Sequence, residues 1–62
     1  MTITDRRELQ ARLTAAGFDA GAADGVIGAR SRDAIGSYQE RTGLAATGEP
    51  SLDLLRRLRA GV

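Results

Sequence analysis

The sequence predicts an all-α protein, a compact three-helix bundle with a long glycine-rich loop between its first two helices. Three observations support this fold class. Apolar residues recur at helical spacing in three separate segments. A glycine stands at or just past the end of each segment, where glycine commonly terminates a helix. With 62 residues and no cysteine or histidine, the chain must be stabilised by helix packing, without disulfides or a zinc site.

The first helix is expected over residues 5–16. Asp5 is the predicted N-cap, because Glu8 follows it at the spacing of a capping box. Leucines four residues apart give this segment one apolar stripe. Gly17 is the expected stop.

The loop between the first two helices is expected over residues 19–29. Its length is unusual in so small a protein, unless the loop is functional or packed. Val26 and Ile27 are apolar, so we expect both to pack against the core. We also expect Gly28 to adopt a positive φ, which would make Gly28→Val destabilising.

The second and third helices are expected over residues 30–42 and 50–59. Gly36 interrupts the second helix at a cost of roughly 1 kcal/mol, which suggests close helix–helix contact there unless the weakness is simply tolerated. Gly43 is its expected end. Pro50 fits the first position of the third helix, because its missing N–H has no partner to lose there.

A short repeat links these two helix starts. Residues 28–35 align with residues 48–55 at an offset of 20, and Gly, Ser and Asp recur. We interpret this as one glycine-turn-into-helix device used twice. Ser31 and Ser51 are each expected near a helix N-terminus.

Composition limits the possible functions. Nine arginines against eight acids give a net charge of +1, which provides no strong field for nucleic acid or a membrane surface. No apolar run approaches the 18 residues of a membrane span, and no signal peptide begins the chain. A calcium loop is not expected, because Ala20 and Ala22 stand where oxygen ligands would be needed. We expect a single domain, residues 1–62, that is monomeric and binds no metal or cofactor. If its target lies outside the cytoplasm, we expect it to be part of a longer exported protein.

Several spaced motifs together resemble the peptidoglycan-binding-like (PGBD-like) domain family over about residues 8–58. The matching residues are Leu9-Gln10, Leu13, Gly17-Phe18, Asp24-Gly25, Gly28, Ser31, Ala34-Ile35, Tyr38-Gln39, Gly43-Leu44, Thr47-Gly48 and Leu54-Leu55. The combination of spacings is specific, whereas any single pair is not. The sequence departs from the family where Ser31 and Ser51 replace the commoner Thr, and where Ala29 replaces a frequent Pro.

The resemblance implies a non-catalytic three-helix module that brings a cell-wall enzyme to peptidoglycan. The sequence of residues 17–21 and the pair Tyr38-Gln39 are most similar to the C-terminal module of lytic murein transglycosylases. Such a module would work in the periplasm or at the extracellular cell wall. Its partners would be a glycan or stem peptide and an attached catalytic domain.

The ligand-binding residues expected from the loop, the second helix and the resemblance are Gln10, Asp24, Gly25, Ile27, Gly28, Ser31, Tyr38 and Gln39. Structural roles compete with this interpretation. Asp24 before a glycine is typical of a turn, and the two glutamines border apolar stripes where an amide often ties a loop to a helix. Tyr38 is expected in the core.

Other functional classes fit less well. Catalysis without histidine, cysteine or lysine would need paired carboxylates in a cleft, and 62 residues can hardly enclose one. A helix-turn-helix DNA-binding domain joins its helices by about 3–4 residues, whereas both connections expected here are longer. A protein-binding or intramolecular regulatory module of the same fold remains the main alternative.

Overall fold

The computed structural model describes residues 1–61 and contains three α-helices within them, which confirms the predicted fold class. Helix α1 spans Ile3–Ala15, α2 spans Ala29–Arg41 and α3 spans Leu52–Arg59. Each predicted helix end lies within two residues of the observed one. No helix in residues 1–61 has both the length and the apolar content needed to cross a membrane.

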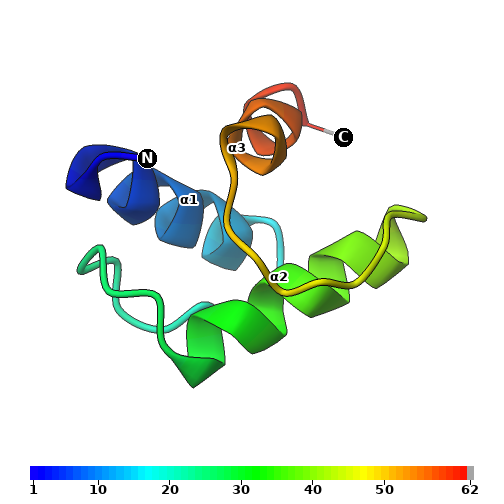
Figure 1. The fold of residues 1–62 in the computed structure, drawn as a ribbon, viewed down its shortest axis with the longest axis horizontal. Coiled ribbons are helices and arrows are strands. Elements are labelled where there is room, and N and C mark those ends of the chain that lie inside the picture. The colour runs from blue at the N-terminus through cyan, green and yellow to red at the C-terminus, as the bar shows by residue number, and fades with distance from the viewer. Residues whose placement is uncertain (62) are drawn as a thin grey trace.

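Helix α1 is the central element of the fold. It packs against both α2 and α3, whereas no Cα atom of α2 lies within 8 Å of one in α3 among the described residues. The connection from α2 doubles back along that helix before it rises to α3 (Figure 1). The space between α2 and α3 is therefore bordered by side chains and by this connection, not by direct helix packing.

All three helices contribute to one apolar core. Its buried members are Leu9, Leu13, Ala20, Ala34, Ile35, Tyr38, Leu54, Leu55 and Leu58, with Phe18 and Ile27 partly buried against them. The Phe18 and Tyr38 rings meet edge to face, 5.6 Å between centroids. The expectation that Ile27 packs against the core is confirmed.

The start of α1 differs from the prediction. Thr2 is the N-cap, and its Oγ1 accepts a hydrogen bond from the Asp5 amide at 3.1 Å. The Asp5 carboxylate accepts in turn from the Thr2 amide at 3.1 Å, so the capping box is one turn earlier than expected. Thr2 with Asp5 and Asp5 with Glu8 both have the spacing of a capping box. A helix that starts after Thr2 also includes Arg6, which donates to the carbonyls of Met1 and Gly25. The assignment of Asp5 as the N-cap was wrong.

The start of α3 also differs. Ser51 is the N-cap, and its Oγ accepts from the Leu54 amide at 3.1 Å, so Pro50 lies before the helix rather than at its first position. A serine hydroxyl at the N-cap accepts a hydrogen bond from a free backbone amide of the first helical turn, and the proline side chain has no atom that can accept one. The N-cap of α2 is Gly28, which has no side chain to do this, and Ser31 lies inside the helix. The two copies of the repeat are therefore not structurally equivalent.

Two expectations about the long loop were wrong. Gly28 has a φ of −96°, whereas Gly25 has a φ of +82°. A Cβ on Gly25 would lie 2.5 Å from Cγ1 of Ile3, so this glycine is required by both backbone and space. Val26 is 68% exposed, because hydrogen bonds rather than its side chain hold the turn.

The glycine within α2 has no packing role in the described structure. A Cβ on Gly36 would meet no atom within 4 Å. The close helix–helix contact suggested for this position is therefore absent, and the internal structure does not require its small size.

Candidate functional site

The predicted loop site forms a shallow hollow beside the start of α2. It has a volume of about 310 Å³ and is lined by Gln10, Ala20, Gly21, Ala22, Asp24, Val26, Gly28, Ala29, Arg30 and Ser31. Four of the eight expected ligand-binding residues therefore lie together. The question is whether their polar groups are available to a ligand.

Gln10 is the centre of this region and is only 1% exposed. Its Nε2 donates to the Val26 carbonyl at 2.9 Å and to the Ser31 hydroxyl at 3.0 Å, with a longer contact of 3.4 Å to Asp24 Oδ1. Its Oε1 accepts from the Gly25 amide at 2.8 Å. The amide of Gln10 thus ties α1 to the loop and to α2, which confirms the structural interpretation of this residue.

The neighbouring polar groups are also committed to the fold. The Ser31 hydroxyl donates to the Ala20 carbonyl at 2.9 Å. Asp24 Oδ1 accepts from the Val26 amide at 2.9 Å, as expected of a turn-forming aspartate. This bond, followed by the contact with Gln10, lowers the pKa of Asp24. The hollow is therefore lined mostly by groups whose hydrogen bonds are already made within the chain.

The other four expected residues lie elsewhere. Gly25 is buried under Ile3, while Ile27 and Tyr38 pack in or against the core. Gln39 bonds to Thr47 and Gly48 in the connection between α2 and α3. The sequence therefore grouped residues of which the structure brings only four together around this hollow.

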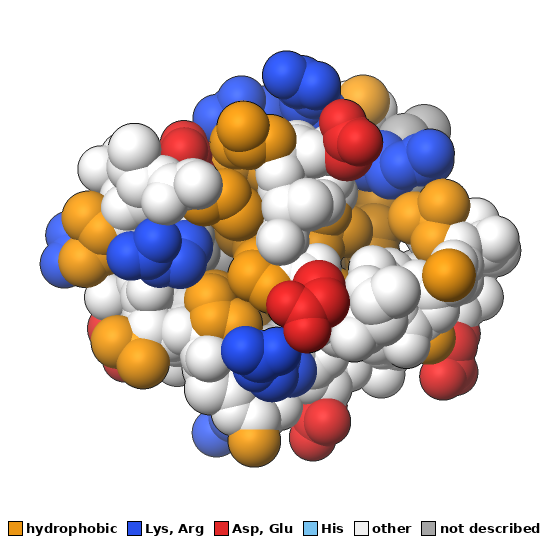
Figure 2. Space-filling model, viewed as in Figure 1, with side chains coloured by type: hydrophobic (Ala, Val, Ile, Leu, Met, Phe, Trp, Pro, Cys, Tyr) orange, Lys and Arg blue, Asp and Glu red, His pale blue; other side chains and the backbone are white. Residues whose placement is uncertain are grey.

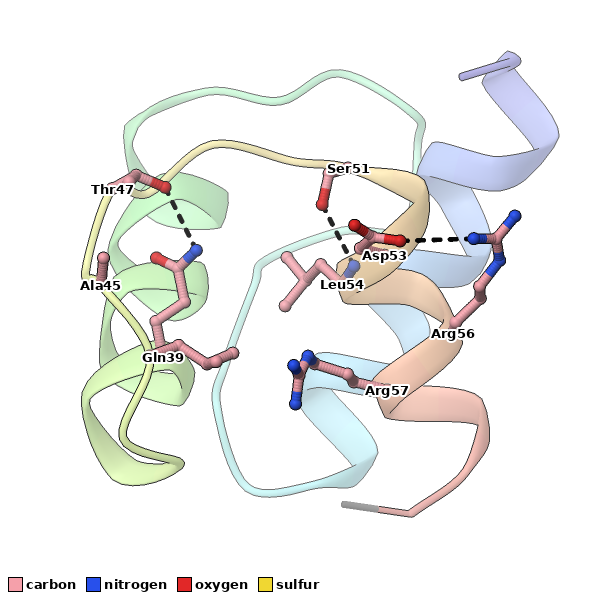
Figure 3. Close-up of a pocket in the computed structure, with 9 residues that line it drawn as sticks. Gln39, Ala45, Thr47, Ser51, Asp53, Leu54, Arg56 and Arg57 are labelled. Atoms are coloured by element: carbon pink, nitrogen blue, oxygen red, sulfur yellow. Dashed lines mark hydrogen bonds and ion pairs between the residues drawn. The ribbon is translucent and has the colours of Figure 1, made fainter.

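A larger hollow of about 530 Å³ lies between α2 and α3, under the connection that joins them. Figure 3 shows side chains from α2, the connection and α3 around it. Its lining residues are Gln39, Leu44, Ala45, Thr47, Ser51, Asp53, Leu54, Arg56 and Arg57. We call this the α2–α3 hollow. It exists because those two helices do not pack directly against each other.

The Gln39 amide forms one wall of the α2–α3 hollow. Its Oε1 accepts from the Gly48 amide at 2.9 Å, and its Nε2 donates to Thr47 Oγ1 at 3.2 Å. With only 7% of the residue exposed, Gln39 fixes the connection to α2 much as Gln10 fixes the long loop to α1. The structural interpretation of Gln39 is confirmed as well.

Charged groups around the hollow are of both signs. Asp53 and Arg56 pair at 3.3 Å, both on α3. Arg57 has no ion-pair partner among residues 1–61, and Figure 3 shows its guanidinium directed toward the middle of the hollow. In the space-filling view, apolar surface shows through in the middle of one face with charged side chains around it (Figure 2).

Sequence reasoning missed most of this second region. Thr47 entered only as part of the family pattern, and Ser51 only through the repeat and as a departure from that pattern. Arg57 was not among the expected ligand-binding residues, because nothing in the sequence shows that α2 and α3 stand apart. The position of Gln39 beside an apolar stripe was the one available signal, since a buried amide needs a loop partner. In the structure that partner is the Gly48 amide.

A separate charged cluster joins α1 to α3. Glu8 accepts from Arg12 at 2.7 Å and, with both carboxylate oxygens, from Arg59 at 2.7 Å. The bonds from Arg59 and then Arg12 lower the pKa of Glu8 from 4.5 to about 2. Arg59 has a raised pKa for the reciprocal reason. These groups stabilise the helix pair and lie outside both hollows.

No grouping of three histidine, cysteine, aspartate or glutamate side chains suited to a metal ion occurs within residues 1–61. The acids that line the hollows, Asp24 and Asp53, are separate and are held by a backbone amide or an arginine.

Comparison with known proteins links this chain to peptidoglycan binding. Residues 2–58 match a family profile described as "Putative peptidoglycan binding domain". A search of curated proteins gave no match. Among solved structures, the chain is similar to SltB3 from Pseudomonas aeruginosa, in complexes with NAG-anhNAM-pentapeptide and with NAG-NAM-pentapeptide.

In both SltB3 structures the TM-score is 0.92 and the sequence identity is 47% over 95% of this chain. The matched region is 16% of the SltB3 chain, so the protein described here spans about a sixth of that relative.

Proposed function

The chain belongs to the peptidoglycan binding domain family, and on that premise we propose that it is a non-catalytic module that holds an attached or partner cell-wall enzyme on peptidoglycan. A module of this kind acts outside the cytoplasm, in the periplasm or at the extracellular cell wall. Hydrolysis or transglycosylation would be performed by the enzyme, not by this chain.

The observation that carries the proposal is the α2–α3 hollow, taken with the family membership. Its volume of about 530 Å³ falls in the range of roughly 300–1,000 Å³ typical of ligand sites. Leu44, Ala45 and Leu54 give it apolar surface, and hydroxyl, amide and guanidinium groups surround that surface. This mixture suits a ligand that carries both amides and small apolar groups, as NAG-NAM-pentapeptide does.

The loop hollow provides a second candidate contact. Asp24, Gly28 and Ser31 line it, and the neighbouring Gly25 amide donates to the Gln10 side chain. Because most of its polar groups already bond within the chain, we assign it a supporting role in contacting a long ligand. Gln39 then belongs to the α2–α3 hollow, which it lines, whereas Tyr38 packs in the core.

A non-catalytic role agrees with the electrostatics of the described residues. Glu8, Asp19 and Asp24 all have lowered pKa values, so they favour the charged form that accepts hydrogen bonds from arginine or backbone N–H groups. A general acid needs the opposite shift, toward neutral pH. None of these three carboxylates is suited to proton donation.

DNA binding is disfavoured by the connections. Residues 16–28 join α1 to α2 and residues 42–51 join α2 to α3, both far longer than the turn of about 3–4 residues in a helix-turn-helix.

Weak affinity for peptidoglycan is enough for a tethered module, because attachment to the enzyme converts later encounters into intramolecular ones.

Titration of the ¹⁵N-labelled chain with NAG-NAM-pentapeptide tests the proposal, with a duplex DNA of matched charge concentration as the control. We expect amide shifts around Gln39, Thr47 and α3, smaller shifts around Asp24, and retention of the chain on insoluble sacculi. No shift with the muropeptide and no retention on sacculi would overturn the function.

A further inference from the structure

We propose that the α2–α3 hollow recognises the C-terminal carboxylate of a peptidoglycan stem peptide, with Arg57 as the residue that binds this anion. The inference rests on the proposed function and specifies which chemical group of the ligand is read. Neither the family match nor the relatives assign a role to Arg57. The argument depends on the charges, hydrogen bonds and surface chemistry of the hollow.

The charge around the hollow favours an anion at one place. Of its three charged residues, Asp53 and Arg56 neutralise each other at 3.3 Å. Arg57 is left with no ion-pair partner within residues 1–61 and extends toward the middle of the hollow (Figure 3). A guanidinium presents paired N–H donors that match the two oxygens of a carboxylate.

Two hydroxyl groups add unused donors at the rim. Thr47 Oγ1 accepts from the Gln39 side chain and from the Glu49 amide, both at 3.2 Å. Ser51 Oγ accepts from the Leu54 amide. Neither hydroxyl donates a hydrogen bond within the part of the chain that the structure describes, so each O–H remains available to an acceptor.

The rim therefore offers free donors, while two of its acceptor groups already have a partner within the chain. The Gln39 carbonyl oxygen is bonded to the Gly48 amide, and the Asp53 carboxylate is paired with Arg56. A sugar hydroxyl can both donate and accept hydrogen bonds, whereas a carboxylate only accepts them. The free donors at Thr47, Ser51 and Arg57 therefore suit a carboxylate.

The apolar part of the hollow fits a peptide end better than a sugar ring. The chain has one phenylalanine, one tyrosine and no tryptophan, and the described Phe18 and Tyr38 rings pack against each other at the core. No aromatic side chain lines the hollow to stack on a sugar. Leu44, Ala45 and Leu54 instead offer a small apolar surface for the short side chain beside a terminal carboxylate.

The test compares two probes, NAG-NAM-pentapeptide with its free C-terminal carboxylate and the same molecule with a C-terminal carboxamide. Binding of each is measured by NMR titration to the wild-type chain and to Arg57→Gln. Arg41→Gln is the matched control, because Arg41 is likewise exposed in the last turn of a helix and does not line the hollow. Both variants lose one positive charge.

We expect Arg57→Gln to weaken binding of the carboxylate probe on the order of fivefold, as for loss of one solvent-exposed charge-assisted hydrogen bond. The carboxamide probe should bind the wild type about as weakly as the carboxylate probe binds Arg57→Gln. Arg57→Gln should not weaken binding of the carboxamide probe further. Arg41→Gln should leave both affinities within about twofold.

The outcomes separate the two proposals. If wild type binds sacculi and both probes equally, and Arg57→Gln changes nothing, carboxylate recognition is overturned while the peptidoglycan-binding function stands. If neither probe nor sacculi bind, both proposals fail. If Arg57→Gln loses the native NMR spectrum, Arg57→Lys is measured in its place. It keeps the positive charge and should keep part of the preference for the carboxylate probe.

Discussion

At the scale of single residues, two buried glutamine side chains fix the two long connections of this fold to its helices. Gln10 forms hydrogen bonds with the long loop and with Ser31, and Gln39 bonds to the connection before α3. Each amide uses its oxygen for one backbone N–H and its nitrogen for loop or helix oxygens. The loops are long but pinned, so hollows beside them keep their shape without a disulfide.

The first prediction compares these two glutamines. Gln10→Leu leaves the buried Gly25 amide and the Ser31 hydroxyl without their partner, and should cost about 3 kcal/mol in the free energy of unfolding. Gln39→Leu affects fewer bonds nearer the surface and should cost about 1 kcal/mol. Urea unfolding followed by circular dichroism measures both. Equal costs would contradict the central role assigned to Gln10.

The second prediction concerns two glycines of the long loop. Gly25→Ala should destabilise the chain by about 1–2 kcal/mol, because its φ of +82° disfavours a side chain. The added Cβ would also meet the side chain and carbonyl of Ile3. Gly28→Ala should change stability by less than about 0.5 kcal/mol, since Gly28 has a negative φ and open space around it.

Thermal unfolding of both variants distinguishes the positions. The prediction fails if Gly28→Ala lowers the melting temperature as much as Gly25→Ala does.

At the scale of helices, the contact between α1 and α3 is reinforced by an ion cluster of one carboxylate and two guanidinium groups. Glu8 forms an ion pair with Arg12 on its own helix and a bidentate ion pair with Arg59 on α3. The Glu8 side chain is 29% exposed, so water and salt screen the cluster in part. It nevertheless joins residues 51 positions apart in the chain.

The third prediction is a pH dependence that this cluster confers. The pKa of Glu8 falls from 4.5 in the unfolded chain to about 2 in the folded one, with the bonds from Arg59 as the main cause. A lowered folded pKa means that the carboxylate stabilises the fold fully above about pH 4.5. This contribution is lost progressively as the pH falls to about 2.

Glu8→Gln isolates the effect, since glutamine has no proton to gain. The difference in melting temperature between wild type and Glu8→Gln should be greatest near pH 7 and should shrink between pH 4.5 and 2. Added salt should reduce the difference at pH 7. A difference that stays constant across this range would show that Glu8 does not titrate as described.

The fourth prediction concerns the start of α1. Thr2→Ala removes the oxygen that accepts from the Asp5 amide and should destabilise the chain by about 1 kcal/mol. Thr4→Ala, also exposed and within the same turn, is the control and should have a smaller effect. Equal melting temperatures for the two variants would argue against the capping box at Thr2.

At the scale of the whole molecule, the sequence predicts the helices much better than it predicts what lies between them. Apolar spacing and terminal glycines place all three helices, because those signals are local. Thr2 and Asp5 each begin a possible capping box, and the choice between them depends on contacts with the distant Gly25 that spacing does not reveal. Helix ends are therefore less predictable than helices.

The candidate site was harder to predict for a related reason. Gln10, Asp24 and Ser31 do meet in space, yet their polar groups turn out to bond mainly to each other and to the backbone. The α2–α3 hollow arises from a missing helix contact, which leaves no mark on either helix sequence. Arg57 is indistinguishable from a solvated arginine until the fold places it beside that hollow.

The final prediction concerns what such a small module does for a larger enzyme. Fusing this chain to a lysozyme should speed cleavage of insoluble sacculi at low enzyme concentration, because a bound module raises the local concentration of substrate around the catalytic domain. Cleavage of a soluble glycan fragment should not change, since a single small substrate cannot engage both domains at once. The Arg57→Gln fusion should lose part of the gain on sacculi, whereas Arg41→Gln should keep it. Equal rates for the fusion and for lysozyme alone, under conditions where the fusion binds sacculi, would separate binding from targeting and leave this chain as an anchor that does not assist catalysis.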